Sequence, residues 1–309
     1  MSIGFDKSAH NFLHLTHTYG MNTFKKIALP VLTLATCFNF FLFPACKHHT
    51  PTTPTGDNLN VSVLPNKEEI PPHTSETPAP APTVLDIWQT NDIDISHLNL
   101  EKKHVAFTFD DAPGKTLERL VAVFTEFNEN NPDCKASATV FYNGIYFNEN
   151  TLPSVQTAYV AGFEMGNHTY SHFNLCALDT QTLQKEIDDT DAILKQIDGK
   201  DRHLLRAPYG SLNETVKQTA KSPIIDWSID TLDWQNPEVE TICERVYKGL
   251  ENGAIVLMHD GFENTVQAVK ILLPELKKMG YQVTSVSQLA KVHSCSLKTG
   301  SVYTRARNK

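Results

Sequence analysis

Short apolar runs alternate with amphipathic stretches through most of the chain after residue 98. Four of the mostly apolar runs have the length of β-strands: residues 104–109, 138–142, 224–227 and 254–258. Elsewhere, apolar side chains recur at helical spacing, which predicts helices over residues 117–127, 183–197, 239–250 and 266–276. Asp179 and Gly199 supply start and stop signals for the second of these helices. The alternation predicts an α/β fold with a parallel sheet, built either as a barrel or as a doubly wound sheet.

The N-terminal region has a different pattern, which is typical of an export signal. Within residues 21–46, two lysines precede a long apolar run, and Cys46 ends it. The pattern predicts a start at Met21, with residues 1–20 as an upstream extension. The Ala-Cys junction resembles the end of a bacterial lipoprotein signal, in which the cysteine is lipidated; plain cleavage and a retained membrane anchor are the alternatives. The protein is therefore expected in the cell envelope, either tethered to the membrane, periplasmic or secreted.

Residues 47–99 form a linker whose first part, up to about residue 83, is rich in proline and threonine. Such a composition cannot bury enough apolar surface to offset the entropy lost on ordering, so an extended tether is expected. The tether would hold a domain, residues 100–295, away from a membrane. A basic tail over residues 296–309 follows, and it is expected to be frayed.

Composition limits the partners and the redox chemistry. The chain of 309 residues has a formal net charge of −8 and no long basic stripe, which argues against nucleic acid as a partner. The domain contains four cysteines: Cys134, Cys176, Cys243 and Cys295. In an exported protein this even number permits two disulfides in three pairings, and free thiols are the alternative.

Two adjacent carboxylates, Asp110 and Asp111, end the first predicted strand, and two histidines four residues apart, His168 and His172, come later. One carboxylate and two imidazoles suit a divalent metal, and the second carboxylate is then left to handle a proton. In a parallel α/β fold such residues gather at the carboxyl ends of the strands. The combination predicts metal-assisted hydrolysis.

Each of these residues also has a simpler interpretation. The two aspartates could cap the following helix, and the histidines could be ordinary surface residues. A metalloprotease would need Glu where the chain has Thr169, and an iron oxygenase would leave Asp110 and His259 unexplained. The remaining histidines stand in the sequence without recognisable partners and receive no role, including His104, His203 and His293.

Five segments resemble, in order, the five motifs of the polysaccharide deacetylases, the NodB-homology group of carbohydrate esterases. They are Thr-Phe-Asp-Asp (108–111), His-Thr-Tyr-Ser-His (168–172), Arg-Ala-Pro-Tyr (206–209), Asp-Thr-Leu-Asp-Trp (230–234) and Leu-Met-His (257–259). The resemblance covers residues 100–295. Ala112 departs from it, since the family usually has Gly there, and the longer stretch 128–137 is expected to reshape one side of the groove. The resemblance implies a distorted (β/α) barrel that removes N-acetyl groups from a sugar.

The resemblance also implies a role for each motif residue. Zn²⁺, or another divalent metal such as Co²⁺, would be held by Asp111, His168 and His172. Asp110 would be the general base, and Arg206 would pair with it and keep it ionised. Because adjacent residues on an extended strand point to opposite sides, Asp110 and Asp111 can serve one site only where the strand bends.

The remaining motif residues would handle the leaving group and the substrate. His259 would be the general acid, kept protonated by the carboxylate of Asp233 or, alternatively, of Asp230. The backbone N–H of Tyr209 would stabilise the oxyanion. The side chains expected to contact the substrate are those of Tyr209, Trp234 and Leu257.

The predicted tether places the domain within reach of peptidoglycan, whose N-acetylglucosamine is therefore the expected substrate. The alternatives are a chitooligosaccharide, an exopolysaccharide or O-acetylated xylan. A non-catalytic glycan-binding lipoprotein on the same fold is a further alternative. It would be expected to have lost at least one of five residues, which are all present: Asp110, Asp111, His168, His172 and His259. The sequence does not indicate an oligomeric state.

Overall fold

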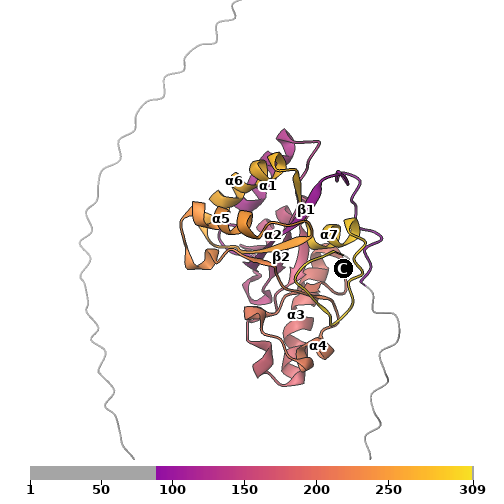
Figure 1. The fold of residues 1–309 in the computed structure, drawn as a ribbon. Helices are drawn as coiled ribbons and strands as arrows, with labels where there is room; N and C mark the ends of the chain where they lie inside the picture. Colours follow the sequence, from indigo (N-terminus) through magenta and orange to yellow (C-terminus); the bar gives the residue numbers. More distant parts are fainter. Residues whose placement is uncertain (1–87, 308–309) are drawn as a thin grey trace, which may run out of the picture. The chain divides into compact units, whose positions relative to one another are not determined.

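The computed structural model describes residues 88–307 (Figure 1). The predicted upstream extension, the export signal and the linker up to residue 87 lie outside these residues, as do the last two residues of the chain. Within the described part, none of the helices has the length and apolar character needed to span a membrane.

The strands form one curled sheet in which all neighbours run parallel. The order is β6-β7-β1-β2-β3-β4-β5-β9, and β8 pairs with β1 outside this path. The strands are β1 (Lys103–Ala112), β2 (Thr139–Tyr142), β3 (Glu164–Asn167), β4 (Leu204–Leu205), β5 (Ile224–Ile225), β6 (Ile229–Asp230), β7 (Ala254–His259), β8 (Tyr281–Thr284) and β9 (Val302–Tyr303). The long central strand β1 lies among β2, β7 and β8, so residues near its end are close to several other strand ends.

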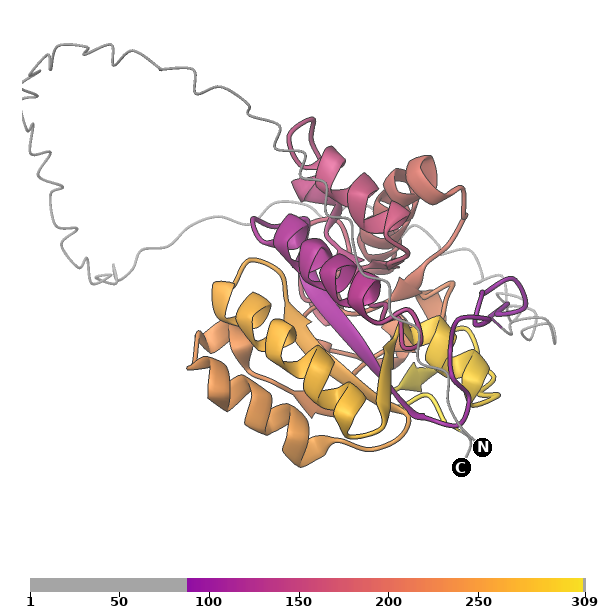
Figure 2. The ribbon, with the colours of Figure 1, turned by 90° about the horizontal axis from the view of Figure 1, so that it is seen from above.

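Helices pack against the curled sheet, most of them on its outside. They are α1 (Leu117–Asn130), α2 (Leu152–Val160), α3 (Thr180–Asp198), α4 (Glu214–Thr219), α5 (Val239–Gly249), α6 (Glu263–Lys278) and α7 (Val286–Val292), with short 3₁₀ turns η1 (Gly144–Tyr146), η2 (Leu175–Ala177), η3 (Pro208–Gly210) and η4 (Asp233–Gln235). Contacts run in the order α5, α6, α1, α2, α3 and α4. Figure 2 shows α5, α6 and α1 side by side, and Figure 1 shows α3 and α4 at the other end of the row.

The side chains of the strands alternate between two apolar clusters. On β1, Phe107 and Phe109 belong to the cluster beneath the outer helices, whereas Ala106 belongs to the cluster inside the curled sheet. Phe141 of β2 fills this interior, and a Cβ at Gly166 of the neighbouring strand would lie only 2.5 Å from its ring. On β1 the inner register continues from Ala106 to Thr108 and Asp110, so polar side chains follow the apolar one toward the carboxyl end of the strand.

The predicted boundaries of the long helix α3 are confirmed. The side chain of Asp179 accepts a hydrogen bond from the backbone N–H of Thr182, which satisfies one of the amides at the start of the helix. Gly199 ends the helix with φ of 77°, a left-handed conformation that glycine adopts without steric cost.

Two predictions about the ends of the domain are wrong. The C-terminal segment is not frayed up to residue 307, because β9 pairs with β5 and Arg305 forms a bridge to Ala254 at the start of β7. Leu297 and Ala306 are buried in the inner cluster. The packed domain also begins before residue 100, since the backbone N–H of Trp88 donates to the carbonyl of Leu297.

The stretch 128–137 lies away from the catalytic groove, so its predicted effect on that groove is wrong. It connects the end of α1 to the beginning of β2, which places it at the amino ends of the strands. There the side chain of Asn128 exchanges hydrogen bonds with the backbone of Ala136, and the N–H of Ser137 donates to Val283. The cysteines whose pairing the sequence left open are free thiols: Cys134, Cys176, Cys243 and Cys295.

Candidate active site

A cavity of about 500 Å³ opens at the carboxyl ends of the strands. All of the predicted site residues line it except Arg206 and Asp233, which are completely buried and contact residues in its wall. The lining comes from segments far apart in the sequence, at or just after the carboxyl ends of β1, β3, β4, β5, β6 and β7. The sheet therefore collects the five motifs at one rim.

The end of β1 bends, so both aspartates face the same cavity. Asp110 continues the inner register of Ala106, and its residue is 3% exposed. Asp111 has φ of 63°, and the register between β1 and β2 shifts at this point. This left-handed residue interrupts the alternation of the strand. Ala112 does not share the positive φ, so the substitution of the family's usual glycine carries no strain of that kind.

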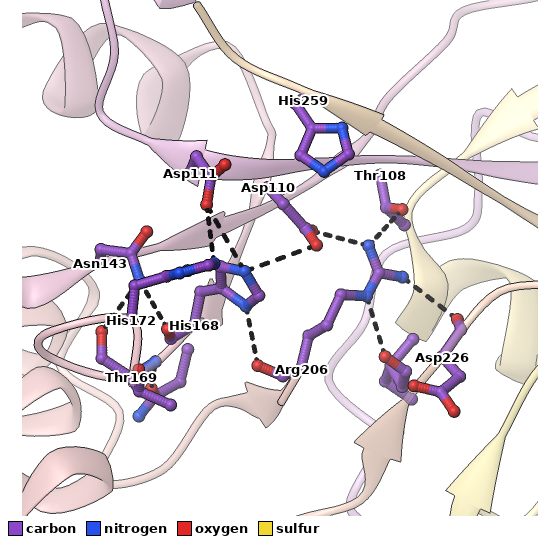
Figure 3. Close-up of polar contacts among 12 residues, drawn as sticks. Thr108, Asp110, Asp111, Asn143, His168, Thr169, His172, Arg206, Asp226 and His259 are labelled. Atoms are coloured by element: carbon purple, nitrogen blue, oxygen red, sulfur yellow. Dashed lines mark hydrogen bonds and ion pairs between the residues drawn. The ribbon is translucent and has the colours of Figure 1, made fainter. Parts of the chain in front are cut away.

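The bend brings Asp111 close to both motif histidines (Figure 3). One carboxylate oxygen, Oδ1, lies 3.3 Å from Nε2 of His172 and 3.6 Å from Nε2 of His168. One ligand atom from each of the three residues lies within 4.8 Å of the others. Ligands about 2.1 Å from a tetrahedrally coordinated ion are about 3.4 Å apart, so this donor set fits a divalent metal.

Hydrogen bonding and burial both prepare the two rings for metal binding. Nδ1 of His168 lies 2.8 Å from the carbonyl oxygen of Arg206, to which it can donate, and this tautomer leaves the Nε2 lone pair for a metal. Burial, and then the charge of His168, hold the pKa of His172 below its ordinary value. A lowered pKa favours the neutral ring, which is the form that binds a metal.

The loop carrying the histidines contains strained backbone. Thr169 has φ of 69° and His172 has φ of 58°, values that non-glycine residues adopt rarely. The side-chain amide of Asn143, at the end of β2, donates to the carbonyl of His168 at 2.6 Å and to that of Thr169 at 3.3 Å. Figure 3 shows this amide pointing at the turn. The strain is therefore held in place by buried hydrogen bonds.

Asp110 is paired with Arg206 behind the cavity. The guanidinium donates to Asp110 at 2.8 Å and to the hydroxyl of Thr108 at 2.6 Å. The other carboxylate oxygen of Asp110 lies 3.6 Å from Nε2 of His168, so it faces the metal-binding atoms. Burial alone raises the pKa of Asp110, but the charges of Arg206 and of nearby histidines outweigh it and hold the pKa below its usual value. The carboxylate is thus ionised and able to accept a proton.

His259 is paired with Asp233, which settles the alternative that the sequence left open. Nδ1 of His259 lies 2.8 Å from Oδ1 of Asp233, while the backbone N–H of His259 donates to Oδ2 at 2.8 Å. The carboxylate of Asp230 instead accepts from the backbone N–H of Leu232. Burial lowers the pKa of His259, but Asp233, and more weakly the two aspartates of β1, raise it to about 9. The ring is therefore protonated at neutral pH and can give up a proton.

Exposed aromatic side chains form the outer wall of the cavity. Tyr209 and Trp234 are 67% and 51% exposed, and Leu257 of β7 is a buried part of the lining. Tyr209 has φ of 62°, and its ring meets that of His172 edge to face at 4.8 Å. On the other side of the metal-binding residues, Tyr146 lines a smaller hollow of about 310 Å³.

Sequence reasoning missed several residues that support the site. Thr108 and Asn143 share the inner register of their strands, so the period of two could have indicated them. Asp260 accepts hydrogen bonds from the backbone of Gly114 and from both donors of Thr116, and it thereby joins the loops after β7 and β1. Nothing in the spacing distinguishes Asp260 from the acidic residues of the surface.

The family model for polysaccharide deacetylase matches residues 97–223. A peptidoglycan-N-acetylglucosamine deacetylase of Bacillus cereus is 34% identical over 199 residues, which span 62% of this chain and 89% of that protein. The chain belongs to the polysaccharide deacetylase family. The peptidoglycan-N-acetylmuramic acid deacetylase PdaC of Bacillus subtilis is 31% identical over 194 residues, 62% of this chain but only 39% of PdaC.

A solved structure described as T48 deacetylase with substrate has the same fold as this family member. It superposes with a TM-score of 0.61 at 28% identity and covers 67% of this chain and 99% of its own. The predicted distorted (β/α) barrel is thereby confirmed, in the form of a curled, incompletely closed parallel sheet.

Proposed function

We propose that the protein is a Zn²⁺-dependent deacetylase that removes N-acetyl groups from N-acetylglucosamine units of peptidoglycan. One observation carries the proposal: the cavity joins a carboxylate–dihistidine set to an ionised Asp110 and a protonated His259. Amide hydrolysis needs an activated water, a base for its proton and an acid for the departing nitrogen. A site that had lost catalysis would have no need to keep all three.

The residues of the chain supply the proton transfers. A divalent ion held by Asp111, His168 and His172 would supply a polarised water and a positive charge for the carbonyl oxygen. Asp110 would accept the proton of the water, while Arg206 keeps that carboxylate ionised between turnovers. His259 would then donate a proton to the leaving nitrogen. The N–H of Tyr209 would donate to the carbonyl oxygen as it gains negative charge.

Zinc is the metal we propose, because two imidazoles and one carboxylate form a common set of protein ligands for catalytic Zn²⁺. Three protein ligands leave a coordination position for water and substrate. The neutral ring favoured at His172 and the hydrogen-bonded Nδ1 of His168 support binding through Nε2.

Peptidoglycan is the substrate we propose, because the two relatives described above are named for acting on it. The exposed rings of Tyr209 and Trp234 suit the apolar faces of sugars. The export pattern within residues 21–46 supports a location in the cell envelope, where this polymer would be within reach.

Acetate release from purified peptidoglycan tests the proposal. The purified full-length protein should release acetate, lose this activity after chelation and regain it with Zn²⁺. The variant His172→Ala should lose both the bound metal and the turnover. Acetate from chitooligosaccharides alone would move the substrate to another glycan. Stoichiometric metal without acetate from any acetylated glycan would contradict the assignment as a hydrolase.

A further inference from the structure

His203, a histidine outside the cavity, lies in a buried cluster behind the loop that carries His168 and His172. It directly precedes β4 and is 1% exposed. Its Nδ1 lies 2.9 Å from the carboxylate of Asp191, and its Nε2 lies 3.2 Å from that of Asp198, both on α3. Lys200 lies 3.8 Å from the other oxygen of Asp198. Because both ring nitrogens face carboxylate oxygens, which only accept hydrogen bonds, the geometry requires a doubly protonated ring.

The cluster continues through Asn167, the last residue of β3. The same oxygen of Asp191 that faces His203 accepts a hydrogen bond from the side-chain amide of Asn167 at 2.8 Å. This amide also donates to the carbonyl of Ile187 at 2.9 Å. Both groups that contact the amide nitrogen of Asn167 are hydrogen-bond acceptors. The nitrogen and the oxygen of this amide therefore cannot exchange places.

That orientation aims the amide oxygen of Asn167 at the loop of the metal site. The oxygen accepts from the backbone N–H of Thr169 at 2.8 Å, and Thr169 has the left-handed φ of 69°. The residue between them is His168, whose ring Nε2 faces Asp111. A β-branched residue holds this conformation only where its surroundings impose it. The hydrogen bond from Thr169 is one of the contacts that do so.

We propose that the buried network of His203, Asp191 and Asn167 is a positioning device for the metal site, which fixes the backbone at Thr169 and thereby the direction of the His168 ring. His203 acts through its neighbours and does not touch the substrate, so it is a positioning residue. The inference rests on the metal site of the proposed function. Outer hydrogen bonds of this kind typically change metal affinity about 10–100-fold when they are removed.

The alternative is that the cluster only attaches α3 to β4, in which case metal affinity would follow stability alone. Leu194→Ala provides the matched control, because Leu194 is a fully buried residue of α3 in a different cluster. It should destabilise the same helix through a cavity without touching the network.

The experiment measures the dissociation constant for Zn²⁺ by competition with a chelating indicator, using full-length protein under conditions where each variant is folded. Asn167→Ser should weaken Zn²⁺ binding about 10–100-fold, and His203→Gln by about tenfold. Asp198→Asn should have a smaller effect because the bonds among Asp191, Asn167 and Thr169 remain. Leu194→Ala should stay within about twofold of the wild type.

The outcomes separate this inference from the proposed function. Equal affinity losses in His203→Gln and Leu194→Ala, or no loss in His203→Gln, would overturn the positioning role while leaving the metal site intact. A wild-type protein that binds no Zn²⁺ would instead refute the metal site itself. If His203→Gln does not fold, Asp191→Asn decides the question: a weakened affinity supports the network, and wild-type affinity overturns it.

Discussion

His259 and His203 each have Nδ1 within 2.9 Å of an aspartate carboxylate, yet only His259 borders the cavity. His259 has a single carboxylate partner, Asp233, and its ring lines the cavity. His203 has carboxylates on both ring nitrogens and is sealed beneath α3. The pKa is raised in both cases, although burial opposes it. Under the proposed mechanism the difference is that His259 keeps its Nε2 for a reactant, whereas carboxylates occupy both ring nitrogens of His203.

The largest effect on turnover is expected at Asp110, whose carboxylate lines the same cavity as His259. Asp110→Asn should lower kcat by about 10³-fold or more, because the amide cannot accept the proton of the water. Zn²⁺ should remain bound, since Asp110 is not among the three predicted ligands. Steady-state kinetics together with metal analysis check both statements.

Asp226→Asn is the matched control for this variant. Asp226 is a partly buried aspartate near Arg206, but only its backbone carbonyl accepts from the guanidinium. We expect its kcat within about tenfold of the wild type. Near-normal turnover by metal-loaded Asp110→Asn would show that another group is the base.

Replacing His259 and His203 in turn by glutamine tests the comparison directly. His259→Gln should lower kcat by about 10²–10³-fold with little change in Zn²⁺ affinity, because a neutral amide is a poor proton donor. His203→Gln should act mainly on Zn²⁺ affinity, and most of its kcat should return at saturating Zn²⁺. A kcat for His203→Gln as low as that of His259→Gln, with metal fully bound, would contradict the division of roles.

The difference between the histidines also marks how far the sequence could be interpreted. The motifs were sufficient to predict the three residues that the structure brings together as a possible metal site, because the spacing and order of the motifs can be recognised without coordinates. The interior direction of Asp110 follows from the alternation along β1. The expectation that His203 lacks partners was wrong, because Asp191 and Asp198 lie 12 and 5 residues away on α3 and meet it only when that helix packs beside β4.

Several features of the backbone could not be predicted from the sequence, for a related reason. The left-handed residues Asp111, Thr169 and Tyr209 are not glycines, so their residue types did not indicate a left-handed backbone. The short strands that were not predicted, such as β6 with two residues and β9 with two, are defined by pairing across the sheet and carry little periodicity of their own. The C-terminal segment was mistaken for a tail because its order depends on β5 and on Ala254.

The pH dependence of turnover should report the His259 pair. The acid must be protonated, so kcat should fall as the pH rises through a pKa of about 9. Asp233→Asn removes the charge and hydrogen bond that raise this pKa, so the fall should begin at lower pH. The same limb should not move in Asp198→Asn, whose carboxylate faces only the sealed histidine. A pH–rate profile of the three metal-saturated proteins tests this, and equal shifts in both variants would argue against His259 as the acid.

The smallest expected effect is a pH-dependent change in the free energy of unfolding, and it should arise mainly from His203. Because its folded pKa is raised, its contribution is fully present below the unfolded pKa and is lost as the pH rises through the folded value. Burial raises the pKa of Asp198, but hydrogen bonds from His203 and from the backbone of Lys200, together with their charges, outweigh it and lower the pKa. The contribution of Asp198 is therefore lost as the pH falls through the folded pKa.

The free energy contributed by this unit should therefore be greatest between the two transitions, around neutral pH. Urea unfolding from pH 4 to pH 10 should show His203→Gln less stable than the wild type by about 1–3 kcal/mol near neutrality, with the difference shrinking toward both extremes. Comparing the two proteins cancels the titration of His259 and of the other groups they share. A difference that stays constant across the range would mean that the ring contributes packing and not charge, and the geometric requirement for a doubly protonated His203 would then be wrong.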